Sequence, residues 1–346
     1  MKKVILIFLF IPSLLFAQQT INDSIYIDGT YRSFTTYIPQ IYNPSKPTPL
    51  VLNFHGLTGS SNIAMWHADF RSIADTANFI IVHPQGLLNN QGETHWNIGQ
   101  IGSSVDDINF ISKLLDSLSS KYNINSERVY STGMSNGAYL SYRLACELSD
   151  KIAAIAPVAG SYISYMLNIC NPSHSTPVLH IHGVADSSSI YNGKPGVESI
   201  SSILSFWVNY NECDTQSIYM QIANINLSDS SNVEHYIWKN GINGVEVEHL
   251  KIIDGGHTWP GSSFTNNNGG NTNYDINACN EIWKFFSKYD INGLIGTNTE
   301  IIDINSEEKQ LIRIIDVLGK SINETKNLPC FFIYDDGTVE KKIILE

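Results

Sequence analysis

The sequence has few charged residues and no excess of cations. Charged residues make up 16% of the 346 positions, and 21 Lys and Arg stand against 33 Asp and Glu. The net charge of −12 repels nucleic-acid phosphates and anionic membrane surfaces, because binding to either needs clustered cations. The charge balance therefore argues against nucleic acid as a partner.

Metal-ligand motifs and membrane-spanning runs are also missing. None of the five cysteines lies in a CxxC motif or beside a histidine at ligand spacing, so we expect no metal site. Beyond the N-terminus no stretch is long and apolar enough to cross a bilayer, which takes about 20 residues. We therefore expect that the chain is not an integral membrane protein.

The N-terminus has the layout of a secretory signal peptide. Lys2 and Lys3 precede an apolar run from Val4 to Phe16, and Ala17 offers a small residue for cleavage. The run is shorter than the roughly 20 residues of a membrane anchor, which is the alternative interpretation. We predict that residues 1–17 are a signal peptide and that the mature protein is secreted.

Export to an oxidising compartment permits disulfide bonds. Cys146 and Cys170 flank an apolar segment, and we expect them to pair. The spacing identifies no partner for Cys213, Cys279 or Cys330.

Short apolar runs alternate with helical patterns over most of the chain. The runs at 50–54, 79–82, 128–132, 152–158 and 178–181 are bounded mostly by Pro, Gly or polar residues, which is typical of strands covered on both faces of a parallel sheet. Apolar residues recur at helical spacing over 108–118, and a second helix-like segment covers 197–207. The sequence therefore predicts an α/β fold with a mainly parallel central sheet flanked by helices.

Other segments complete this outline. Asp28-Gly29 is a favoured turn between two strands within 25–38, 245–253 alternates like a strand exposed on one side, and 262–274 is an Asn- and Gly-rich loop. A last helix ends near Tyr289, after which three strand-like runs indicate a separate small β domain. We expect an enzyme domain over 18–290 and a small all-β domain over 291–346.

The segment Gly133-Met134-Ser135-Asn136-Gly137 is the strongest sign of chemistry. It lies between a predicted strand and a predicted helix, and a sharp strand-to-helix turn is what lifts a nucleophilic serine above a sheet. The pattern also occurs by chance as a glycine-rich turn. Its strand-then-helix context favours Ser135 as a nucleophile.

Two partners follow Ser135 in the chain. Asp186 comes just after the run 178–181, and His257 lies in a glycine-rich loop after 245–253. The carboxyl ends of neighbouring strands meet at one edge of a parallel sheet, so we expect Asp186 to orient His257 and His257 to act as the general base for Ser135.

Acyl transfer also needs two backbone N–H donors for the oxyanion. The glycine-rich turn His55-Gly56-Leu57 follows the run 50–54, and the residue after the nucleophile is Asn136. We assign these two donors to Leu57 and Asn136.

Several further residues have structural explanations as good as functional ones. Asp106 and Asp107 open a helix, where carboxylates interact favourably with its dipole, and His180 and His182 share a strand face without a third metal ligand. Trp96 and Trp259 are candidates either for the substrate cleft or for the core.

Together these motifs resemble the secreted esterases of the polyhydroxybutyrate depolymerase and feruloyl esterase group, within the α/β-hydrolase superfamily. The likeness spans about residues 32–286 and includes Gly133 to Gly137, His182-Gly183-Val184-Ala185-Asp186 and Gly255-Gly256-His257-Thr258-Trp259-Pro260-Gly261. It implies Ser135, Asp186 and His257 as the triad. The family often has a cysteine or another residue where Leu57 stands, and commonly pairs a cysteine like Cys213 with one near Gly241, which is absent here.

The tail resembles the C-terminal sorting domain of the type IX secretion system of Bacteroidetes, through Asp316-Val317-Leu318-Gly319 and the segment 334–342. This resemblance implies the type IX machinery as a partner and an extracellular or surface-attached enzyme. The alternative is a small β module that packs on the enzyme or binds glycan.

We expect a serine carboxylic ester hydrolase that needs no cofactor and acts on feruloyl or acetyl esters of plant cell-wall polysaccharide. The alternative substrate is polyhydroxyalkanoate. A serine peptidase and a non-catalytic surface-binding protein are the remaining hypotheses.

Overall fold

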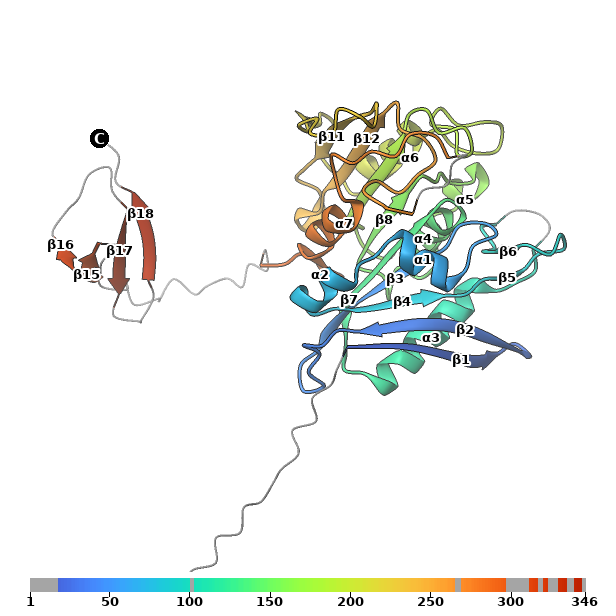
Figure 1. Ribbon diagram of the computed structural model, residues 1–346, viewed down its shortest axis with the longest axis horizontal. Coiled ribbons are helices and arrows are strands. Elements are labelled where there is room, and N and C mark those ends of the chain that lie inside the picture. Colours follow the sequence, from blue (N-terminus) through green and yellow to red (C-terminus); the bar gives the residue numbers. More distant parts are fainter. Residues whose placement is uncertain are drawn as a thin grey trace, which may run out of the picture. The chain divides into compact units, whose positions relative to one another are not determined.

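The chain forms two compact units, residues 1–297 and 298–346. The computed structural model (Figure 1) describes residues 18–99, 103–264, 269–296, 311–316, 320–322, 329–334 and 339–343. The predicted signal peptide at 1–17 lies outside the described residues, as do 317–319 and 335–338 of the tail motifs.

The first unit contains a ten-stranded mixed sheet in the order β1-β2-β4-β3-β7-β8-β9-β12-β11-β10. The six central strands run parallel to one another. They are β4 (Ile80–Pro84), β3 (Thr48–Phe54), β7 (Ile124–Met134), β8 (Ala154–Val158), β9 (Val178–Gly183) and β12 (Val247–Ile253). The predicted mainly parallel sheet is confirmed, and each expected apolar run is one of its strands.

Antiparallel strands close both edges of this sheet. The expected hairpin is confirmed as β1 (Gln19–Ile27) and β2 (Thr30–Ile38). Asp28 and Gly29 both have positive φ, which matches the twist of a two-residue hairpin turn. At the other edge, β11 (Asn232–Trp238) and β10 (Ile218–Gln221) pair antiparallel beyond β12.

Helices cover both faces of the sheet. One core cluster packs under α3 (Asp107–Lys121), α4 (Asn136–Glu147) and α6 (Ile200–Tyr210), and the other under α2 (Arg71–Ala77) and α7 (Ala278–Phe286). Shorter elements are α1 (Ser61–His67), α5 (Ser164–Asn168), η1 (Ile242–Gly244), and the pairs β5 (Leu87–Leu88) with β6 (Thr94–His95) and β13 (Tyr289–Asp290) with β14 (Gly293–Leu294). No helix in the described ranges combines the length and the hydropathy needed to cross a bilayer.

The prediction that 245–253 is exposed on one side is wrong. Residues 247–250 and Ile252 of β12 are buried. The reason is that β12 lies between β9 and β11 inside the sheet, where helices cover the polar positions of an alternating strand as well as the apolar ones.

The predicted disulfide between Cys146 and Cys170 is confirmed. It joins the end of α4 to the segment after α5. Cys213 and Cys279 are buried free thiols. A Cβ atom built on Gly241 would lie 2.8 Å from Cys213 Sγ, so this chain has glycine at the place where a pairing cysteine would sit.

The second unit contains a four-stranded antiparallel sheet in the order β16-β15-β17-β18. Its strands are β15 (Leu311–Ile315), β16 (Ser321–Ile322), β17 (Pro329–Tyr334) and β18 (Val339–Ile343). The first unit extends a few residues past the expected boundary at 290, because Ile291 N–H donates to the Glu127 carbonyl and Gly293–Leu294 pairs with β13.

Candidate active site

Ser135 occupies a sharp turn between β7 and α4. Its backbone has φ 57° and ψ −121°, a strained conformation for a residue with a side chain. The turn is possible because the chain passes very close to β3 on either side of it: a Cβ on Gly137 would lie 2.4 Å from the Phe54 carbonyl oxygen, and one on Gly133 2.8 Å from it. This is the geometry of a nucleophile elbow.

Asp186 and His257 meet at the carboxyl end of the parallel strands. His257 Nδ1 lies 2.7 Å from Asp186 Oδ2, and because a carboxylate only accepts, Nδ1 carries the proton and Nε2 is left as an acceptor. Asp186 is 4% exposed, and its Oδ1 accepts the N–H groups of Ser188 and Ser189 at 2.8 Å each. These bonds fix the carboxylate that faces the imidazole.

Ser135 Oγ has no hydrogen-bond partner among the described residues. The structure thus forms the predicted hydrogen bond between Asp186 and His257. It does not form one between Ser135 and His257. Contacts between a nucleophile and its base are often long without substrate and tighten when it binds.

The two predicted oxyanion donors have unoccupied N–H groups. In the described parts of the chain no acceptor contacts the N–H of Leu57, and Asn136, as the first residue of α4, has no partner one turn earlier. Gly56 packs against Ser135, since a Cβ built on it would lie 3.3 Å from Ser135 Cβ. The turn that carries Leu57 therefore lies beside the nucleophile.

His55 holds that turn in place. Its Nε2 accepts the Gly86 N–H at 2.9 Å, so Nδ1 is protonated and donates to the Gly56 carbonyl at 2.7 Å. The C=O and N–H of a trans peptide point in opposite directions, so fixing the Gly56 carbonyl also fixes where the Leu57 N–H points. Burial lowers the pKa of His55 to about 4, so the imidazole stays neutral at neutral pH and keeps Nε2 as an acceptor.

A cavity of about 410 Å³ opens beside Ser135. Its lining is rich in amide and hydroxyl groups. The polar residues are Asn89, Asn90, Gln91, His95, Asn97, Ser103, Ser135, Asn136 and Tyr139. Leu57, which is 47% exposed, and Trp96 add apolar surface.

Trp96 combines both roles considered for it. It lines the cavity, yet it is only 1% exposed and packs on Phe54 and His55. The Asn136 side chain accepts the Trp96 N–H at 2.6 Å and donates to its carbonyl at 3.1 Å. The side chain after the nucleophile therefore fastens the cavity wall to the elbow, a role that the sequence alone did not indicate.

Trp259 lies in the core and is not among the residues that line the cavity beside Ser135. It is 1% exposed and packs edge-on against Phe70. Of the two alternatives for this residue, its position matches the core.

Asp106 and Asp107 have different roles. Asp106 caps α3, accepting the Asn109 N–H at 2.9 Å. Asp107 is fully buried, pairs with Arg32 at 2.6 Å and accepts the Asn97 N–H at 2.7 Å. The expectation of a helix-dipole role thus fits Asp106. Asp107 instead neutralises the buried Arg32, which needs a partner of opposite charge, and its second oxygen holds the backbone after Trp96.

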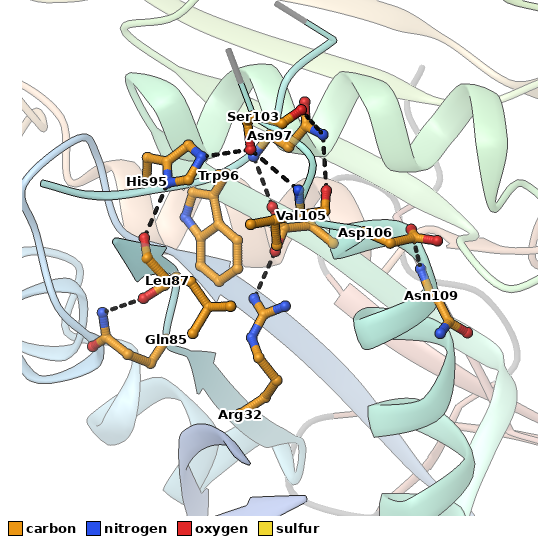
Figure 2. Close-up of polar contacts among 12 residues, drawn as sticks. Arg32, Gln85, Leu87, His95, Trp96, Asn97, Ser103, Val105, Asp106 and Asn109 are labelled. Atoms are coloured by element: carbon orange, nitrogen blue, oxygen red, sulfur yellow. Dashed lines mark hydrogen bonds and ion pairs between the residues drawn. The ribbon is translucent and has the colours of Figure 1, made fainter. Parts of the chain in front are cut away.

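The same segment is fastened at His95 (Figure 2). His95 Nδ1 contacts the Leu87 carbonyl at 3.0 Å, and Nε2 contacts Ser103 Oγ at 2.8 Å. Figure 2 also shows Asn97 bonded to Ser103 and Val105. These contacts join residues 95–97 to residues 103–105, and both of these short segments contribute side chains to the lining of the cavity.

A buried histidine chain stands behind Asp186. His182 Nε2 lies 2.7 Å from the Ser189 carbonyl and 3.4 Å from Asp186 Oδ2, so it must be the donor. His182 Nδ1 then accepts from His180 Nε2 at 3.1 Å, and His180 Nδ1 accepts from the Tyr142 hydroxyl at 2.6 Å. Burial lowers the pKa of both histidines. They are packed and hydrogen-bonded, and the described residues contain no cluster able to hold a metal.

Comparisons with known proteins show the family to which the chain belongs. A family model described as esterase PHB depolymerase matches residues 32–227. The bifunctional acetylxylan esterase/xylanase XynS20E of Neocallimastix patriciarum is 27% identical over 81% of this chain and 36% of its own length, and feruloyl esterase B of Piromyces equi is 28% identical over 47% and 30%. The matched part thus spans about a third of each of these relatives.

A bacterial and a structural relative were also found. Poly(3-hydroxyalkanoate) depolymerase C of Paucimonas lemoignei is 30% identical over 32% of this chain and 28% of its own. The acetyl xylan esterase from Aspergillus awamori superposes with a TM-score of 0.55 at 16% identity, covering 78% of this chain and 99% of that one, a likeness of fold. Because the family model covers more than half of the 346 residues, the protein belongs to the esterase PHB depolymerase family and has the α/β-hydrolase fold.

Proposed function

We propose that this protein is a serine carboxylic ester hydrolase acting on feruloyl or acetyl esters of plant cell-wall polysaccharide. The observation that carries the proposal is the 2.7 Å hydrogen bond between His257 and Asp186 at the sheet edge where Ser135 occupies the elbow. The relatives named as feruloyl and acetylxylan esterases support the substrate class.

The reaction uses groups of this chain alone. Ser135 Oγ attacks the acyl carbon while His257 Nε2 takes its proton, and Asp186 stabilises the resulting imidazolium. The N–H groups of Leu57 and Asn136 donate to the oxyanion. His257 returns the proton to the sugar oxygen as its bond to the acyl carbon breaks, so that the sugar leaves with a free hydroxyl, and a water activated by the same imidazole then hydrolyses the acyl-enzyme.

The cavity beside Ser135 favours a sugar-bearing substrate over a polyester. The exposed side-chain amides of Asn90 and Gln91 in its lining offer both donors and acceptors. A polysaccharide matches both with hydroxyl groups, whereas a polyhydroxyalkanoate has only ester oxygens and leaves protein acceptors unpaired, which costs binding free energy.

Polyhydroxyalkanoate depolymerisation is the second candidate. It is supported by the 30% identity with the Paucimonas lemoignei depolymerase over 115 residues. Leu57, exposed at the cavity, would be the apolar contact for such a chain.

A hydrolysis panel tests the proposal. We expect the protein to hydrolyse methyl ferulate and acetylated xylan faster than a polyhydroxybutyrate film, and Ser135→Ala to lower kcat by about 10⁴-fold or more with an unchanged circular dichroism spectrum. Faster hydrolysis of the polyhydroxybutyrate film than of the other two substrates would favour the second candidate, a polyhydroxyalkanoate depolymerase. Retained turnover by Ser135→Ala would remove Ser135 from the mechanism.

We also propose that the enzyme is secreted and that residues 291–346 are read by type IX secretion machinery. The support is the signal-peptide layout of 1–17 and the motif resemblance of the tail, together with its separate compact unit.

A further inference from the structure

A second cavity, of about 400 Å³, lies between α6 and the strands β11 and β12. It shares no lining residue with the cavity beside Ser135. Its volume is within the range of about 300–1,000 Å³ that small-molecule sites occupy. Nothing in the proposed reaction uses it.

Aromatic rings form the sheet side of this cavity. Tyr236 and Trp238 are two residues apart on β11 and so point to the same face of the sheet. Their ring planes are 24° apart and their ring centroids are 6.3 Å apart. Tyr219, which is 52% exposed on the edge strand β10, lies 5.3 Å from Tyr236 and continues the aromatic surface toward solvent. Tyr191 is held in place by donating its hydroxyl to His249 at 2.9 Å.

Neutral polar groups form the opposite side. Ser201, Ser205 and Asn209 lie at intervals of four residues on α6, so they share one helix face. All three are exposed. The cation at the cavity, Lys251, is paired with Glu234 at 2.8 Å, so the lining presents no uncompensated charge.

We infer that this cavity binds a sugar ring of a neutral polysaccharide. A pyranose offers apolar C–H faces to the aromatic rings and hydroxyls to the serines and the asparagine, so it matches both sides at once. An acyl chain would leave the polar groups of α6 without hydrogen-bond partners. An anion would have no free cation to pair with, because Lys251 is already paired with Glu234.

Such a site would hold the polymer while Ser135 works on its esters. Binding at two places makes the second event intramolecular and raises the effective concentration of ester groups. The site should therefore lower KM for a polymeric ester and leave the turnover of a small soluble ester unchanged. The choice of xylan as the polymer rests on the proposed function, whereas the cavity itself does not.

Calorimetric titration of the full-length Ser135→Ala variant with linear xylohexaose tests this inference. The oligomer carries no ester, so its binding does not need the catalytic groups. We expect Trp238→Ala to weaken binding at least tenfold. We expect Ser205→Phe, which fills the cavity from an exposed helix position, to do the same without disturbing the core.

Tyr26→Ala is the matched control, because Tyr26 is an aromatic residue 63% exposed on β1 and outside the cavity. Absence of binding by Ser135→Ala, or equal binding by all variants, would overturn the inference. Hydrolysis of methyl ferulate by the unmodified protein, measured in parallel, reports on the proposed function separately: if it fails while binding still depends on Trp238, the cavity assignment stands and the esterase proposal falls.

Discussion

Hydrogen-bond donors and acceptors at the site can be assigned from the fixed partners alone. The Asp186 carboxylate and the Ser189 carbonyl can only accept, and from them the protonation of His257 and His182 follows. Asp186 Oδ2 thus faces two N–H donors, one on the proposed catalytic side and one on the core side. The orientation of the acid depends on both.

The first prediction concerns the acid. Asp186→Asn should lower kcat by about 10⁴-fold, because an amide stabilises the wrong imidazole tautomer and cannot balance the imidazolium. Asp254→Asn is the control: Asp254 is exposed, lies three residues before His257, and has φ 57°, which asparagine tolerates. Steady-state kinetics in which Asp254→Asn lost more activity than Asp186→Asn would show that the acid is misassigned.

The second prediction concerns His182 as a positioning residue. His182→Phe removes the N–H that holds the Ser189 carbonyl and faces Asp186, so we expect kcat to fall about tenfold with KM unchanged. His182→Gln keeps an N–H donor and should restore most of the rate. The low-field proton NMR signal of the His257–Asp186 bond should shift in His182→Phe and return in His182→Gln; an unshifted signal would reduce His182 to a packing role.

At the scale of elements, the site is built where strands end. Ser135 follows β7, Asp186 follows β9, His257 follows β12, and Leu57 follows β3. These strands run parallel in one sheet, so their carboxyl ends share an edge. Residues 95–97 are an addition to this frame, and they are held by hydrogen bonds to Asn136, Asp107 and Ser103.

The third prediction concerns the bond between α4 and the segment after α5. Replacing both Cys146 and Cys170 by alanine should lower the free energy of unfolding by about 2–4 kcal/mol, as expected for a loop of this length. Denaturant unfolding with and without reductant measures it. Reductant should destabilise the unmodified protein and leave the double variant unchanged, since Cys213 and Cys279 are free thiols. Equal sensitivity of the two proteins would contradict the assignment.

For the whole molecule, buried neutral histidines make stability depend on pH. Burial lowers the pKa of His83 and His249 to about 3 and that of His55 to about 4. Each is held by hydrogen bonds in the neutral form. The unfolded chain binds protons at these groups near pH 6.5, whereas the folded chain does not.

The fourth prediction follows from that difference. Between about pH 6.5 and 4 the unfolded state holds more protons, so the unfolding free energy should fall with falling pH by up to about 1.4 kcal/mol per pH unit for each such histidine. Urea midpoints from pH 8 to 4 measure the slope. His249→Gln, which keeps neutral hydrogen-bonding groups, should flatten it; a midpoint constant down to pH 4 would refute the buried neutral histidines.

The fifth prediction concerns the two units. A chain ending at Thr297 should keep its esterase activity when made in a cytoplasmic host, because the boundary between the compact units lies there. A chain ending at Tyr289 should melt at a lower temperature, since it lacks Ile291 and its bond to the Glu127 carbonyl. In the native cell the chain that ends at Thr297 should not be exported. Continued export would contradict the sorting role, and lost activity would show that the tail is structural.

The sequence by itself determined the parts that depend on local pattern. Apolar runs predicted the parallel strands, Asp28-Gly29 predicted the first hairpin, and glycine spacing placed Ser135 on a strand-to-helix turn. Strand ends then predicted that Asp186 and His257 would meet, as they do. These inferences succeed because the carboxyl ends of parallel strands share one edge of the sheet, so residues that follow neighbouring strands lie close together.

Contacts between distant segments were decided only by the tertiary structure. Whether β12 is covered depends on the antiparallel strand β11 beyond it, and the core position of Trp259 depends on packing with Phe70, almost two hundred residues earlier. The partner of Asp107, on α3, is Arg32 on strand β2, and the histidine chain joins α4 to β9. Periodicity records which residues are buried, but the neighbour that each buried polar group finds is set by how the elements pack.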